Sequence, residues 1–295
     1  MGIKAPRRSS RMFGGINSSF EEAKFVIIPV PYDSSTTWLP GARFGPSEVI
    51  DASRYLEPYD IELGATFGNI WTMEEIEPVR ASAKKTIGRV KGAVEWVLSE
   101  KKFPILLGGD HSITVGSVKA FKQRYEDLLC LFFDAHADLY DEYEGSKYSH
   151  ACTARRCYEL GAKIVAFGVR SLGAEEVDFV GKKEDITIVS ALEARSHPEE
   201  ALSKALSRFP ELPVYLSFDV DFLDPSIMPC TGTPEPGGFD WYTTTRLLKK
   251  VISSRRIVGM DFVEFSPVVN RKDAAYLLAK LIYKSIGYLT LFQIQ

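Results

Sequence analysis

The stretch LLCLFFDAHAD, residues 128–138, decides the fold class of this chain. Its first six residues form an unbroken apolar run, which is typical of a strand that is covered on both faces of a parallel sheet. Further short apolar runs occur along the sequence, before and after this one. The predicted strands are 25–29, 105–107, 128–133, 164–167, 186–189, 214–218 and 257–262.

Longer stretches with apolar residues at helical spacing separate most of these runs. They predict helices over 81–100, 112–125, 174–181, 198–209, 242–253 and 273–286. Alternating strands and helices indicate βαβ units, so we expect an α/β fold with a mostly parallel central sheet and helices on both faces. No internal repeat or low-complexity linker interrupts this pattern. We therefore expect a flexible N-terminal arm over 1–22 and a single domain over 23–295.

Composition and charge exclude several classes of protein. An apolar fraction of 45% is too high for a disordered chain. The formal net charge is −3 and no Lys/Arg block is present, so we expect no nucleic-acid partner. The longest apolar runs are too short to span a membrane. The first 20 residues lack the apolar stretch of a secretory signal, and no cysteine lies in a C-x-x-C pair, so we expect a cytoplasmic protein.

Carboxylates and imidazoles follow three of the predicted strands, which is where open parallel sheets bind ligands. In extended backbone, residues i, i+2 and i+4 face the same way, so the spacing of DAHAD presents two carboxylates and one imidazole together. The motif DVD at 219–221 presents two more carboxylates, and the glycines of GGDH at 108–111 permit a turn that aims an imidazole at the same edge. The candidate metal ligands are His111, Asp134, His136, Asp138, Asp219 and Asp221.

Six acceptors from three strand ends predict a site for two cations. A lone Asp-x-Asp after a strand is more often a solvated turn, but three of the four histidines join paired carboxylates here, which makes coincidence implausible. The carboxylate-rich set without thiolates favours Mn²⁺, while Fe, Co, Ni and Zn stay possible. Two such cations hold and acidify a water molecule between them, which supplies hydroxide at neutral pH.

These motifs resemble those of the arginase/agmatinase (ureohydrolase) superfamily. The resemblance rests on GGDHS at 108–112, DAHAD at 134–138 and SFDVDFLDP at 217–225. PYD at 31–33, PGARFGP at 40–46, GTPEPGG at 232–238 and VE at 263–264 also fit, so that it covers about 25–289. It implies a three-layer α/β/α, arginase-like fold and a homo-oligomer, trimeric or hexameric. It also implies a centre of two Mn²⁺ per subunit, whose bridging hydroxide cleaves a guanidino group to urea and an amine.

The resemblance also implies a role for each site residue. One Mn²⁺ would be held by His111, Asp134, Asp138 and Asp219, and the other by Asp134, His136, Asp219 and Asp221. Asp138 would carry the proton of the nucleophile to the leaving amine. His150 would bind near the substrate and relay protons, and Glu264 would pair with the guanidinium through charge-assisted hydrogen bonds.

The segment after DAHAD indicates the substrate. Arginases carry an Asn at the position of Tyr140, where it helps to hold the α-carboxylate of arginine, and the following loop, 141–149, is short here. Both features point to agmatine, a cationic guanidino compound whose hydrolysis gives putrescine for polyamine biosynthesis. Arg155 and Arg156 leave open an arginase, a guanidinobutyrase or a guanidinopropionase. A non-catalytic homologue that acts as a scaffold is the alternative from another class.

Overall fold

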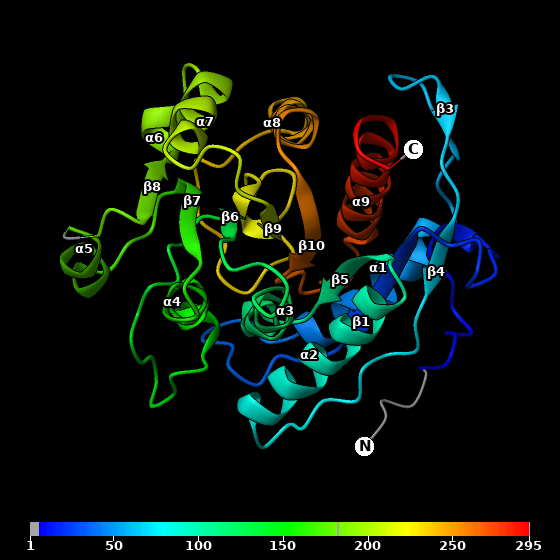
Figure 1. The fold of residues 1–295 in the computed structure, drawn as a ribbon, viewed down its shortest axis with the longest axis horizontal. Coiled ribbons are helices and arrows are strands. Elements are labelled where there is room, and N and C mark those ends of the chain that lie inside the picture. The colour runs from blue at the N-terminus through cyan, green and yellow to red at the C-terminus, as the bar shows by residue number, and fades with distance from the viewer. Residues whose placement is uncertain (1–5, 182, 295) are drawn as a thin grey trace.

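The computed structural model describes residues 6–181 and 183–294, and its centre is an eight-stranded sheet (Figure 1). The strand order is β4-β1-β5-β10-β9-β6-β7-β8, and every neighbouring pair is parallel. The strands are β1 (Phe25–Val30), β4 (Ile70–Thr72), β5 (Phe103–Gly108), β6 (Leu129–Phe133), β7 (Lys163–Val169), β8 (Ile186–Ser190), β9 (Val214–Asp219) and β10 (Ile257–Val263). All seven strands predicted from apolar runs are present. The edge strand β4 and a small antiparallel hairpin, β2 (Tyr59–Asp60) with β3 (Ala65–Thr66), are additional.

Helices cover both faces of the sheet, which confirms the three-layer α/β/α fold. Figure 1 shows α2, α3 and α4 on one side of the strands and α7, α8 and α9 on the other. Alternate side chains of β1 enter opposite cores, with Val26 and Ile28 facing α2 and α3, and Phe25 and Ile27 facing α1 and α9. The helices are α1 (Gly45–Ser53), α2 (Ala83–Ser99), α3 (Thr114–Phe121), α4 (Thr153–Glu159), α5 (Ala174–Val180), α6 (Ala191–Ala194), α7 (Pro198–Ser207), α8 (Trp241–Ser254) and α9 (Lys272–Phe292).

The helices differ from the predicted ones mainly where they are short. The predicted helices correspond to α2, α3, α5, α7, α8 and α9, whereas α1, α4 and α6, with nine, seven and four residues, were not predicted. The last helix, α9, runs to Phe292 and so extends past the predicted end at residue 286. Across 6–181 and 183–294, no helix is both long and apolar enough to cross a membrane.

The N-terminal segment lies along the edge of the sheet from residue 6 onward. Arg8 forms an antiparallel bridge with Met73, just after β4, and the side chain of Phe13 is fully buried. The main-chain N–H of Phe13 donates to Oγ1 of Thr72 at 3.0 Å. Residues 1–5 of the predicted arm lie outside the described residues. The flexibility of the arm over 1–22 stays a prediction.

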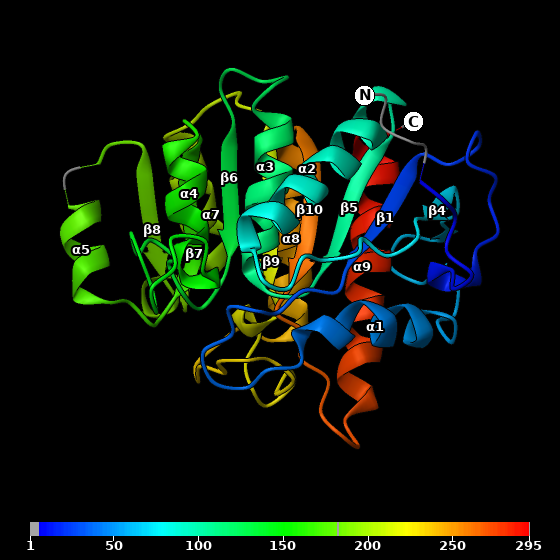
Figure 2. The same cartoon turned by 90° about the horizontal axis from the view of Figure 1, so that it is seen from below.

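The carboxyl ends of the four central strands form one end of the molecule. Figure 2 shows the loop after β1 and the loop after β9 gathered at this end. Because β5, β10, β9 and β6 are consecutive neighbours in the sheet, the residues that follow them lie close together. The motifs GGDH, VE, DVD and DAHAD therefore meet, although up to 156 positions of sequence separate their residues (264 − 108 = 156).

Candidate metal centre and substrate pocket

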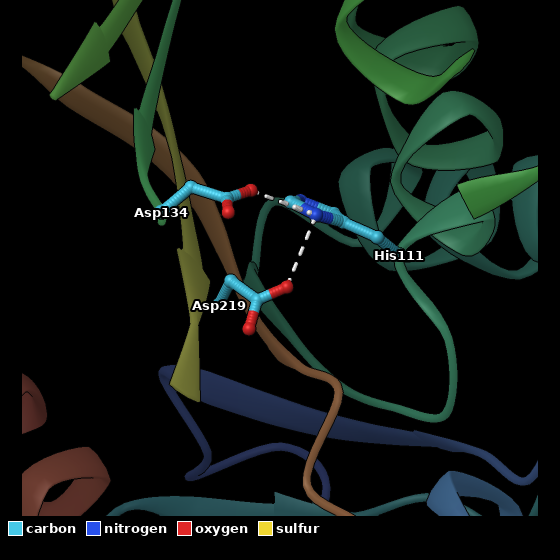
Figure 3. Close-up of side chains that lie close together, drawn as sticks. All are labelled: His111, Asp134 and Asp219. Carbon is cyan, nitrogen blue, oxygen red and sulfur yellow. Dashed lines mark ion pairs between the residues drawn. The ribbon is translucent and has the colours of Figure 1, made fainter. Parts of the chain in front are cut away.

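The first of two donor groups surrounds the imidazole of His111, which stands in a short 3₁₀ helix (His111–Ile113) after β5. Its Nδ1 lies 3.2 Å from Oδ2 of Asp134, 3.0 Å from Oδ2 of Asp138 and 3.4 Å from Oδ2 of Asp219. Figure 3 shows the Asp134 and Asp219 carboxylates pointing at this ring from the ends of β6 and β9. All four side chains are buried. His111, Asp134 and Asp219 lie close enough together to hold one metal ion.

The second donor group shares Asp134 with the first. Nδ1 of His136 lies 2.9 Å from Oδ2 of Asp221 and 3.6 Å from Oδ1 of Asp134, and these three residues could also hold a metal ion. Main-chain amides orient the carboxylates, because Oδ1 of Asp134 accepts the N–H of His136 at 2.6 Å and Oδ1 of Asp219 accepts that of Asp221 at 2.9 Å. The structure thus brings all six predicted ligands into two adjoining groups.

A hydrogen-bond chain behind His111 leaves its Nδ1 turned toward the carboxylates. Nε2 of His111 lies 2.8 Å from Oγ of Ser217, whose hydroxyl donates to Oδ1 of Asp261 at 2.6 Å. With the proton on Nε2, Nδ1 presents a lone pair, and within the described residues this buried atom has no hydrogen-bond partner. A lone pair facing three carboxylate oxygens fits a divalent cation between them.

The electrostatics of the cluster support the same conclusion. Burial and the charges of Asp221 and Asp134 raise the pKa of Asp219 well above its usual range. Burial alone would lower the pKa of His111, but the neighbouring carboxylates of Asp134, Asp138 and Asp219 raise it well above the ordinary value. The concentrated negative charge therefore favours the protonated forms of Asp219 and His111. A divalent cation would balance the same charge without them.

Two residues of the site have a backbone conformation that is rare outside glycine. Asp138 has φ 54° and Glu264 has φ 64°. Such conformations cost of order 1–3 kcal/mol each and concentrate at functional sites. At Glu264 the conformation lets the carboxylate reach back over β5, where Oε1 accepts the main-chain N–H of His111 at 2.6 Å. Glu264 is thus fixed beside the first donor group and lines the pocket above it.

His150 lies at the side of the pocket, in a 3₁₀ helix (His150–Cys152) that precedes α4. Its main-chain N–H donates to Oγ of Ser35 at 3.0 Å, and the Ser35 hydroxyl donates to Oδ2 of Asp110 at 2.8 Å. Nε2 of His150 lies 3.3 Å from the hydroxyl oxygen of Thr37. Asp110, next to a predicted ligand, therefore positions His150 instead of joining the donor groups.

The pocket above the donor groups has a volume of about 250 Å³. Six of the predicted catalytic or ligand residues line it: His136, Asp138, His150, Asp219, Asp221 and Glu264. Tyr140 and Tyr143 also line it, with ring centroids 5.2 Å apart. Among the described residues, no Lys or Arg lines this pocket.

Arg155 and Arg156 have partners elsewhere. Nη2 of Arg156 lies 2.7 Å from Oδ1 of Asp141 and 2.9 Å from Oε1 of Glu159. The guanidinium of Arg155 stacks over the ring of Phe179, 3.6 Å from its centroid, and also pairs with Glu159. Both cations are therefore neutralised on α4 and its neighbours, and neither contributes to the lining of the pocket.

Several site residues were not predicted from the sequence. Ser217 shares a strand face with Asp219, two positions later, and that alternation could have indicated it. Asp261 interrupts an apolar run, which is a signal of a buried functional carboxylate. Glu176 and Glu235 also line the pocket. Glu235 lies in the motif GTPEPGG, which belongs to the resemblance but was given no role there, and Glu176 at the start of α5 carries no sequence signal of its own.

The fold and the two donor groups define an α/β protein built around a site for two metal ions. The sequence model of the arginase family matches residues 23–287, and the chain belongs to this family. It is 38% identical over 280 residues to N(1)-aminopropylagmatine ureohydrolase of Thermus thermophilus, covering 94% of each chain. It is 35% identical to an agmatinase of Pyrococcus horikoshii, covering 90% of this chain and 92% of the relative.

A solved structure agrees with these relatives. The agmatine ureohydrolase of Thermoplasma volcanium superposes with a TM-score of 0.85 at 31% identity, over 95% of this chain and 94% of that one. The resemblance found in the motifs is confirmed, and so are the arginase-like fold and the ureohydrolase activity that it implies.

Proposed function

We propose that this ureohydrolase acts on a guanidino compound whose far end carries a positive charge, with agmatine as the first candidate and putrescine and urea as its products. The lining of the pocket carries the proposal, since it holds carboxylates and no Lys or Arg among the described residues. Arginine would have to desolvate its α-carboxylate there without a cationic partner, which costs several kcal/mol by order of magnitude.

A longer substrate of the same charge type is the second candidate. The relative from Thermus thermophilus and one from Thermococcus kodakarensis, 37% identical to this chain, are both named N(1)-aminopropylagmatine ureohydrolase. Glu176 also lines the pocket, and burial together with the charges of Glu176, Tyr143 and Glu175 raises the pKa of Tyr140, so negative charge surrounds this tyrosine. This distribution suits a chain with more than one ammonium group.

The residues of the site divide the chemistry among them. Two divalent cations, when bound, would acidify a water molecule and stabilise the charge that develops on the guanidino group. Glu264, whose carboxylate accepts the main-chain N–H of His111, would pair with the guanidinium. Asp138 would hold the proton of the nucleophile and pass it to the leaving amine. His150, beside the pocket, would exchange that proton with solvent.

The proposal includes the cofactor and the setting of the enzyme. The ligands are His111, Asp134, Asp138 and Asp219 for one cation and Asp134, His136, Asp219 and Asp221 for the other. Four carboxylates and two imidazoles favour Mn²⁺. We further propose one catalytic domain over 23–295, preceded by an arm over 1–22, in a cytoplasmic homo-oligomer that is a trimer or a hexamer.

Urea release tests the proposed function. The protein is stripped of metal with a chelator, reloaded with Mn²⁺, and assayed with agmatine, N(1)-aminopropylagmatine, arginine and guanidinobutyrate. We expect activity to return with Mn²⁺ and the two cationic substrates to be preferred. Folded, metal-loaded protein that releases urea from none of them would support the scaffold alternative instead. A preference for either carboxylate-bearing compound would contradict the cationic pocket.

A further inference from the structure

All but one of the carboxylates that line the pocket belong to the donor groups or accept main-chain hydrogen bonds. Asp138, Asp219 and Asp221 belong to the two donor groups or contact them. Glu264 accepts the N–H of His111. Glu176, although it lines the pocket, is committed to the main chain, because Oε1 accepts the N–H of Leu139 at 2.7 Å and Oε2 that of Gly173 at 2.8 Å. The remaining carboxylate is that of Glu235.

The main chain of Glu235 is fixed by hydrogen bonds, whereas its carboxylate forms none among the described residues. Its carbonyl oxygen accepts hydrogen bonds from Nη2 and Nε of Arg170, at 2.9 and 3.2 Å. The next turn is tied down by Asp224, whose Oδ2 accepts the N–H groups of Gly237 and Gly238. The loop is therefore anchored at residue 235 itself and just after it. Its side chain, 34% exposed, forms no hydrogen bond among the described residues.

We infer that Glu235 receives the cationic amine at the far end of the substrate, an inference that rests on the proposed function. The carboxylate stands in a pocket that is already rich in negative charge, so a cation is the ligand that it would bind most favourably. Tyr140 and Tyr143 line the same pocket, and the face of an aromatic ring also attracts a cation. Glu235 would therefore determine specificity without touching the reacting atoms.

A second role for Glu235 must be distinguished from this one. Its Oε1 lies 4.0 Å from Nε2 of His136, so it could serve to orient that imidazole. At 4.0 Å the two groups are too far apart for a hydrogen bond, which leaves the carboxylate available to a ligand. An orienting residue would affect metal binding and every substrate alike, whereas a tail-binding residue affects only substrates with a charged tail.

The experiment compares Glu235→Gln with the unchanged protein on two substrates. Agmatine carries a terminal ammonium, and n-butylguanidine has the same carbon chain without it. We expect the variant to lose about 10- to 100-fold in kcat/KM for agmatine, the range of a lost charge-assisted hydrogen bond, and to change by less than about threefold for n-butylguanidine. Two bound Mn²⁺ should remain. Glu193→Gln, an exposed glutamate on α6, is the matched control and should change neither value.

Other results overturn the inference in recognisable ways. Equal losses on both substrates together with lost Mn²⁺ would assign Glu235 to the orientation of His136. If Glu235→Gln leaves the ratio of kcat/KM for agmatine to kcat/KM for n-butylguanidine unchanged, Glu235 does not contribute to substrate specificity. If the unchanged protein releases urea from neither compound, the proposed function fails by itself. Calorimetric binding of agmatine then decides the role of Glu235, because a Kd that Glu235→Gln leaves unchanged contradicts it and one weakened tenfold supports it.

Discussion

The hydroxyl of Ser217 links His111 to Asp261, with Oγ 2.8 Å from Nε2 of the imidazole and 2.6 Å from the carboxylate. This contact selects the imidazole tautomer whose Nδ1 faces Asp134, Asp138 and Asp219. Asp261 itself also accepts the hydroxyl protons of Thr114 and Tyr215, so the support is rigid and buried. The orientation of the first donor group thus depends on a strand residue that is not one of the candidate ligands.

Removal of this support should weaken metal binding. We expect Ser217→Ala to fold normally and to bind Mn²⁺ about 10- to 100-fold less tightly, because the imidazole loses its fixed orientation and tautomer. Metal titration of the stripped protein measures the change. Ser203→Ala, which removes a hydroxyl from α7 away from the site, is the control. Unchanged Mn²⁺ affinity in Ser217→Ala would show that the packing around His111 orients it without the serine.

Asp134 is the residue on which both donor groups depend. We expect Asp134→Asn to reduce the metal content from two Mn²⁺ per chain to less than one and to abolish urea release, because an amide supplies neither the charge nor the second acceptor oxygen. Elemental analysis of the purified variant gives the metal content. Asp273→Asn, at an exposed pair with Arg271, should keep both ions. Two tightly bound Mn²⁺ in Asp134→Asn would refute the shared ligand.

His150 should separate catalysis from metal binding. We expect His150→Asn to retain both cations and to reduce kcat by something like 10²–10⁴-fold, the usual range for a lost acid–base group. Because Ser35 and Asp110 hold the main chain of residue 150, the substitution should leave the loop in place. Turnover measured across the pH range tests this. A rate equal to that of the unchanged protein at every pH would exclude a proton relay through His150.

The turn after β5 should tolerate no side chain at Gly109. A Cβ there would lie 1.7 Å from the carbonyl oxygen of Tyr32, so the backbone would have to shift. We expect Gly109→Ala to lower the free energy of unfolding by about 1–3 kcal/mol or more and to displace the neighbouring site. Gly92→Ala on α2, where a Cβ meets nothing within 4 Å, should instead stabilise by about 0.5–1 kcal/mol. Equal melting temperatures for the two variants would contradict this.

Much of the fold could be predicted because buried parallel strands are continuously apolar. The apolar runs of β5, β6 and β9 are each followed by residues of the site. The prediction of the strands and the prediction of the ligands therefore supported each other. The ligand groups could be predicted for the same reason. The extended backbone expected over DAHAD does not form, because 134–138 follow the end of β6 and Asp138 has φ 54°, and Asp221 lies in a 3₁₀ helix (Val220–Phe222). The ligands meet because they follow the carboxyl ends of neighbouring parallel strands.

Other features depend on tertiary contacts that leave little trace in local sequence. The edge strand β4 has three residues and is defined by its pairing with β1. Arg155 and Arg156 form salt bridges with Glu159 and Asp141 instead of lining the pocket, and such salt bridges cannot be read from the amino-acid sequence. The free carboxylate of Glu235 is recognised only after the partners of every other pocket carboxylate are known. Specificity was therefore less predictable than the metal centre.

The ratio of kcat/KM for agmatine to kcat/KM for arginine tests the central claim most directly. A pocket with carboxylates and without Lys or Arg among the described residues should favour agmatine at least about tenfold, which corresponds to roughly 1.4 kcal/mol of transition-state stabilisation. Both values are measured on one Mn²⁺-loaded preparation at one pH. Equal values, or a preference for arginine, would contradict the account and would mean that the substrate carboxylate finds a partner in the pocket.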